Sequence, residues 1–99
     1  MSEEKSRLRK EVEDIPEERR KFYRKLTDFG AVVAKLMREE EVEAFDLAEA
    51  LDRKEEFVHR MLGGGINVTV ETIAKLEAYF ETEIITINHL DDESVEGDV

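Results

Sequence analysis

The chain has 99 residues, of which 40% are hydrophobic and 41% are charged, with a formal net charge of −11. We expect one small domain, without an apolar stretch long enough to cross a membrane and without an apolar secretion signal at its charged N-terminus. The absence of cysteine excludes disulfides, thiolate metal sites and cysteine nucleophiles. A cytoplasmic protein is therefore expected.

Charge is divided unevenly along the sequence. Residues 5–25 carry nine basic and five acidic side chains, whereas residues 39–62 carry three basic and nine acidic ones, and five more acids lie from Asp91 onward. Nucleic-acid affinity depends largely on Lys and Arg, so the overall balance is unfavourable for DNA binding. A basic arm nevertheless precedes the acidic body. General solubility or a high-salt cytoplasm would explain the acidic excess equally well.

Two helices are expected in the first half of the chain. Pro16, followed by two glutamates, is typical of a first helical turn, so a helix is predicted from Pro16 to about Leu26. Apolar residues recur at helical spacing from Phe29 to Met37 and predict the next helix. Gly30 marks either a kink or the close approach of another helix.

Three shorter helices follow at the same apolar spacing. The first reads through Phe45 to Leu51 and the second through Phe57 to Leu62. The glycines at 63–65 are expected to end the second of these helices, because glycine adopts left-handed and extended backbone angles freely. Thr69 is expected to cap the last helix, whose apolar face runs to Phe80.

After Phe80 the pattern changes to that of a strand. Ile84, Ile85 and Ile87 are β-branched and closely spaced, which predicts a short strand over residues 83–89. A single strand needs a partner for its backbone groups, and the chain offers no second strand. The same strand from a second copy would supply one, giving a symmetric homodimer with these isoleucines at the junction. The alternative is an extended tail packed on the helices.

Four positions define how the middle helices meet. Ala48 is small enough for two helices to approach closely, and Asp52 tolerates the left-handed backbone of a short turn. Val58 and Met61 follow at the spacing of buried residues on the next helix. This pattern is typical of two helices crossing steeply through a three- or four-residue turn.

These residues resemble the Cro/repressor (XRE) family over about residues 26–80. The segments that carry the resemblance are Leu-Ala-Glu-Ala-Leu at 47–51, Phe-Val-His-Arg-Met-Leu-Gly-Gly-Gly at 57–65 and Asn-Val-Thr-Val-Glu-Thr-Ile-Ala-Lys-Leu at 67–76. The resemblance implies an all-α, lambda-repressor-like helix-turn-helix bundle of about five helices that binds double-stranded DNA and regulates transcription. The expected parts are a flexible arm at 1–15, the helix-turn-helix domain at 16–82, the strand at 83–89 and an acidic disordered tail at 90–99.

With a leading helix and a trailing strand, the layout is similar to that of HigA-type antitoxins. That resemblance implies an acidic protein that binds a small basic toxin of the RelE type and represses its own operon. No cofactor is expected.

The family resemblance assigns DNA contacts to the start of the third family helix and the loop after it. The corresponding positions here are Arg53, Lys54, Glu55, His59, Arg60, Gly64 and Asn67. Three departures weaken the match. Glu55 and Glu56 place adjacent acids where a groove lined by phosphate would lie. Glu43 and Ala44 replace the polar pair with which the family opens its second helix, and Arg53 occupies a position that is usually apolar in the family.

The basic arm has two interpretations. On a helix, Arg20 and Arg24 share a face, as do Lys21 and Lys25, and such a face could follow the DNA backbone. It could equally pair with the acids of residues 39–43 inside the domain. The two histidines, His59 and His89, lack spaced metal-ligating partners, so neither a metal site nor an enzyme is expected. The alternative function is a protein-interaction module that binds a basic protein through its acidic face.

Overall fold

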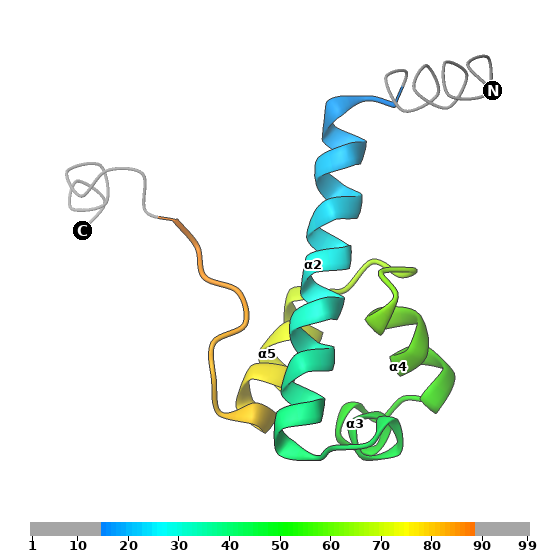
Figure 1. The fold of residues 1–99 in the computed structure, drawn as a ribbon, viewed down its shortest axis with the longest axis vertical. Coiled ribbons are helices and arrows are strands. Elements are labelled where there is room, and N and C mark those ends of the chain that lie inside the picture. The colour runs from blue at the N-terminus through cyan, green and yellow to red at the C-terminus, as the bar shows by residue number, and fades with distance from the viewer. Residues whose placement is uncertain (1–14, 89–99) are drawn as a thin grey trace.

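The computed structural model of the chain describes residues 15–88. Helices are the regular secondary structure found within these residues (Figure 1). No described helix has the length and apolar character needed to span a membrane. The all-α class is confirmed, but four helices occur in the described residues rather than about five. They are α2 (Glu17–Glu40), α3 (Ala44–Leu51), α4 (Glu55–Leu62) and α5 (Val70–Phe80).

The two helices expected in the first half are one continuous helix, α2, of 24 residues. Gly30 does not break it. Instead Gly30 is buried at the place where α4 crosses, and a Cβ added there would lie 2.8 Å from the carbonyl oxygen of Met61. Of the two roles predicted for Gly30, close helix approach is confirmed. The first turns of α2 extend beyond the other helices (Figure 1).

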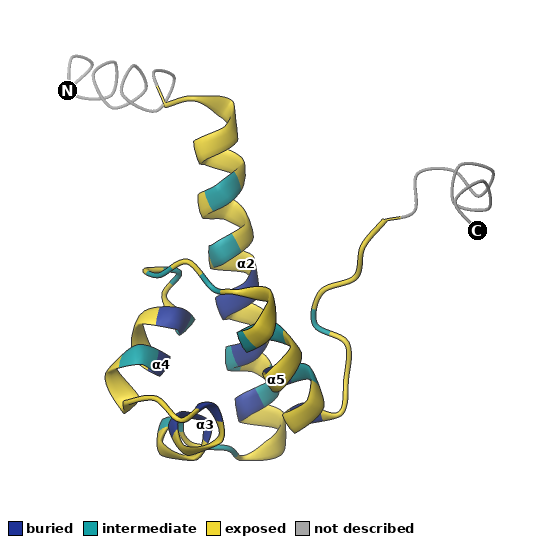
Figure 2. Cartoon of the chain, turned by 180° about the vertical axis from the view of Figure 1, so that it is seen from behind, coloured by how far each residue is buried: buried dark blue, intermediate teal, exposed yellow. Residues whose placement is uncertain are grey.

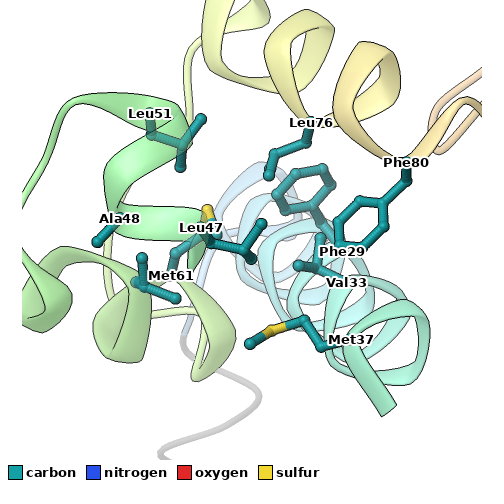
Figure 3. Close-up of a cluster of buried hydrophobic side chains, with 10 residues drawn as sticks. Phe29, Val33, Met37, Leu47, Ala48, Leu51, Met61, Leu76 and Phe80 are labelled. Carbon is teal, nitrogen blue, oxygen red and sulfur yellow. The ribbon is translucent and has the colours of Figure 1, made fainter. Parts of the chain in front are cut away.

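The core lies where α2, α3, α4 and α5 converge, and the buried residues gather there (Figure 2). Figure 3 shows side chains from all four helices meeting in this cluster. Ala48, Val58 and Met61 are buried as their spacing predicts. Phe45 is an exception, because 60% of its surface is exposed. Its place in the apolar pattern of α3 did not bring it into the core.

A three-residue turn joins α3 to α4. Asp52 ends α3 in the left-handed region with φ 54°, and the Arg53 N–H donates to the Ala48 carbonyl at 2.9 Å. The expectation of a left-handed backbone at Asp52 is therefore confirmed. Glu41 and Glu81 end α2 and α5 in the same conformation, with φ of 54° and 53°. Three helices thus stop on acidic residues in a conformation that glycine adopts at less cost.

The segment after α5 is extended but forms no strand within the described residues. The N–H groups of Ile84 and Ile85 both donate to Oε2 of Glu77, at 2.8 and 3.0 Å. Consecutive N–H groups of a regular strand point to opposite sides, so two that converge on one oxygen are incompatible with a strand at that point. Ile84 instead packs against the core, as the alternative of a packed tail expected. Residue 89, the rest of the tail and residues 1–14 lie outside the described residues.

The carboxylate of Glu77 attaches this segment to α5 through the two hydrogen bonds that it accepts. The two backbone hydrogen bonds lower the pKa of its carboxyl group, because they favour the charged form. Because the pKa of Glu77 is lowered in the folded state, the stabilisation from these two hydrogen bonds is fully present at any pH above the ordinary pKa of a glutamate. This stabilisation is lost as the pH falls through the lowered pKa of the folded state.

We expect Glu77→Ala to release Ile84 and Ile85 at neutral pH, and acid to do the same in the wild type. Amide hydrogen exchange at these two residues, followed by NMR, measures the release. Glu83→Ala removes an exposed acid from the same region without touching either N–H and is the control. Equal protection of both amides in wild type and Glu77→Ala would contradict the attachment.

Candidate nucleic-acid interface

One side of α4 packs into the core, and this leaves the opposite side exposed to solvent. Val58 and Met61 are fully buried, so Glu55, Glu56, His59 and Arg60 face solvent. Lys54 is the residue before the first turn of α4 and has extended backbone angles, φ −82° and ψ 155°. The turn from α3 therefore delivers Arg53 and Lys54 to the start of a solvent-facing helix.

Three basic residues surround one shallow groove at this end of α4. Arg53, Lys54 and Arg60 line a groove of about 420 Å³, together with Asp52, Glu56, Phe57 and Ile66. The arrangement brings positions 53, 54 and 60 of the predicted site into one place. Glu55, His59, Gly64 and Asn67 do not line this groove. The groove is lined by three basic and two acidic residues, whereas residues 39–52 carry seven acids and no base.

The Arg53 guanidinium lies over the ring of Phe57, with its central carbon 4.1 Å from the ring centroid. Phe57 is half-buried, so the ring supports the guanidinium from one side and leaves the other side exposed. A cation held against an aromatic face loses part of its side-chain freedom before a ligand arrives. This contact holds the charged Arg53 side chain against an apolar surface at the start of α4.

Arg60 is already engaged within the chain. Its Nη2 atom lies 2.8 Å from Oε1 of Glu56, one helical turn earlier, and both side chains are largely exposed. An exposed ion pair of this kind contributes little to stability. It does occupy the guanidinium, so a base or phosphate would have to displace Glu56 to bind Arg60.

The glycine loop after α4 is closed back onto the helix. The N–H groups of Gly63, Gly64 and Gly65 donate to the carbonyls of His59, Met61 and Arg60. Gly64 has φ 74° and packs against Thr27 of α2, so its role in this structure is the turn itself. A phosphate at this loop would need other donors, and the exposed Asn67 side chain is the remaining candidate from the predicted set.

The basic first turns of α2 do not pair with residues 39–43. Both groups lie on or next to the same helix, and Arg24 and Glu39 are separated by about 22 Å of helix rise. Among the described residues, the ion pairs are Lys21 with Glu17 and Arg60 with Glu56. The interpretation that the arm is neutralised inside the domain is wrong for the described residues. Helix α2 keeps the two groups apart.

Phe57, Ile66 and Glu56 shape the groove but were not among the predicted site residues. The i, i+4 spacing of Glu56 and Arg60, and of Arg53 and Phe57, could have indicated both contacts from sequence. The position of Ile66 at the groove depends on how the glycine loop folds back, which no local pattern indicates. Residues 15–88 also contain no group of three His, Cys, Asp or Glu side chains placed to hold a metal ion.

Comparison with known proteins found no matching family model, no matching curated protein and no matching solved structure.

Proposed function

We propose that this chain is a lambda-repressor-like helix-turn-helix protein that binds double-stranded DNA through α4 and regulates transcription. The observation that carries the proposal is the groove at the start of α4, where Arg53, Lys54 and Arg60 converge on an otherwise acidic body. A short turn places a solvent-facing helix there, and such a helix can enter a major groove. Lys54 would contact phosphate, and Arg60 would contact phosphate or guanine.

The antitoxin subtype follows from the same proposal. A protein that represses its own operon and binds a basic toxin needs a cationic DNA surface and an acidic protein surface on one small domain. The groove supplies the first, and the seven exposed acids of residues 39–52 supply the second. As a regulator it would act as a homodimer on two half-sites.

DNA binding can be tested with a fragment from upstream of the chain's own gene, at low salt. We expect Lys54→Ala and Arg60→Ala each to weaken binding about tenfold or more. We expect Glu56→Gln to strengthen it several-fold, because Arg60 is released and one negative charge leaves the interface. Fluorescence anisotropy with labelled duplex measures all three.

Glu49→Gln on α3 is the matched control for Glu56→Gln, since it removes one exposed acid outside the groove. Lys75→Ala on α5 serves the same purpose for Lys54→Ala, because Lys75 is exposed and does not line the groove. No binding by the wild type at low salt would eliminate the proposal. Equal gains from Glu49→Gln and Glu56→Gln would show that net charge, not the groove, sets affinity.

A second candidate is a protein-interaction module without DNA binding. It is favoured by Phe45, which is 60% exposed among the acids of residues 39–52. An exposed aromatic side chain in an acidic segment suits a basic protein surface with an apolar pocket. For such a module, neither the wild type nor Glu56→Gln would bind the duplex.

A further inference from the structure

Helix α2 carries a second regular face besides the one that enters the core. Its core face holds Phe29, Val33 and Met37, which are buried. The second face consists of residues at alternating steps of four and three, the spacing that keeps side chains in one row along a helix. Its members, all exposed, are Lys21, Lys25, Asp28, Val32, Lys35 and Glu39.

The charges on this face form a pattern about its centre. Val32, the apolar member of the row, is 40% exposed and lies in the middle. Lys25 before it corresponds in spacing to Glu39 after it, and Asp28 corresponds to Lys35. Lys25 and Glu39 each lie seven residues from Val32, and Asp28 and Lys35 lie four and three residues from it, so both pairs place opposite charges at similar distances on the two sides.

Apart from Lys21, which pairs with Glu17, the charged residues of this face form no ion pair within the described residues. The row contains Lys35 and Glu39 at i, i+4 spacing, yet they form no ion pair, and the ion pairs of residues 15–88 involve only Lys21 from this face. The first turns of α2 also reach past the other helices, so a neighbour could approach along the helix (Figure 1).

We propose that a second copy of this chain docks on this face, with the two α2 helices antiparallel and Val32 at the two-fold axis. In that arrangement Lys25 lies opposite the partner's Glu39, and Asp28 lies within one residue of the position opposite the partner's Lys35. The two-fold symmetry repeats each pair, so four pairs of opposite charges form around a contact between the two valines.

Other occupants do not match the row. A parallel second helix would place like charges opposite one another, which is destabilising. DNA would be repelled by Asp28 and Glu39. A uniformly basic or acidic protein would match one sign and oppose the other. An antiparallel copy is the partner whose charges alternate in the required order, since it carries the same sequence reversed.

This surface is distinct from the C-terminal junction predicted from Ile84, Ile85 and Ile87. The N–H groups of Ile84 and Ile85 are bound to Glu77, so they cannot join a strand ladder without leaving that carboxylate. The α2 face needs no such rearrangement. Self-association through α2 is also independent of DNA binding, because it is measured on the protein alone.

The test is a charge exchange in the full chain, measured by sedimentation velocity at low salt over a range of concentrations. We expect the wild type to form a dimer that dissociates with added salt, because exposed ion pairs are screened. Lys25→Glu and Glu39→Lys should each raise the dissociation constant about tenfold, since each turns two attractive pairs into repulsive ones. The double variant restores both pairs in reversed order and should return to within about threefold of wild type.

Matched controls separate the contact from net charge. Glu49→Lys on α3 makes the same change as Glu39→Lys, and Lys75→Glu on α5 makes the same change as Lys25→Glu, both at exposed positions off the face. Circular dichroism confirms that every variant is folded. A wild type that stays monomeric, single variants no weaker than their controls, or a double variant as weak as the singles would overturn the proposal. A dimer lost only in Ile87→Asp would assign the junction to the C-terminal segment instead.

Discussion

Gly30→Ala is expected to destabilise the domain by about 3 kcal/mol. The new Cβ would be in contact with the carbonyl of Leu62 and 2.8 Å from that of Met61, at the crossing of α2 and α4. Both obstacles are backbone atoms at the end of a helix, so no side-chain rotation relieves them. The two helices would have to move apart, and that would open the core around Val33 and Met61.

The direction of the change in stability distinguishes a steric clash from the effect of helix propensity. Alanine in the interior of an exposed helix is more favourable than glycine by about 1 kcal/mol, so propensity alone predicts a stabilised variant. Gly63→Ala is the matched control, because a Cβ there meets no atom closer than 3.8 Å. We expect the control to change the free energy of unfolding by less than about 0.5 kcal/mol. Urea denaturation followed by circular dichroism measures both, and a stable Gly30→Ala variant would contradict the close approach.

Replacing the three left-handed helix ends by glycine should stabilise the protein. Glu41, Asp52 and Glu81 have φ near 54°, a conformation that costs about 1 kcal/mol or more for an ordinary L-residue. Each also places a carboxylate at the negative end of a helix dipole. After allowing for the greater freedom of glycine in the unfolded chain, the triple variant should gain about 2 kcal/mol. Asp52→Gly should contribute least, because Asp tolerates this backbone better than Glu.

Thermal unfolding measures this gain as a rise of about 10 °C in the midpoint. Glu40→Gly is the control, since it removes an acid one position before Glu41 but from within the last turn of α2. There glycine should cost about 1 kcal/mol. If the triple variant and Glu40→Gly shift the midpoint in the same direction, the left-handed conformation is not the source of the effect.

Several parts of the structure could be predicted from the sequence because they depend on local spacing. The three shorter helices follow from apolar residues at 3.6-residue spacing, and the Thr69 side chain caps α5 by accepting the Thr72 N–H at 3.1 Å. The turn at Asp52 and the buried Ala48, Val58 and Met61 also follow from one segment of chain. In the candidate site, the grouping of Arg53 and Lys54 before α4 follows from the same segment.

The other features depend on contacts between segments that lie far apart in the sequence. Whether Gly30 kinks its helix or allows another helix to approach depends on where α4 lies. Apolar spacing alone does not place Phe45 inside or outside the core. The isoleucines after α5 have the composition of a strand, yet the Glu77 carboxylate, seven residues before Ile84, takes the N–H groups that a strand would need. Residues 19–25 and 39–43 have opposite charges, but the continuous helix α2 holds them apart. Apolar spacing predicts which segments are helical, because helix formation is a short-range property, whereas contacts between segments depend on how the helices pack in three dimensions.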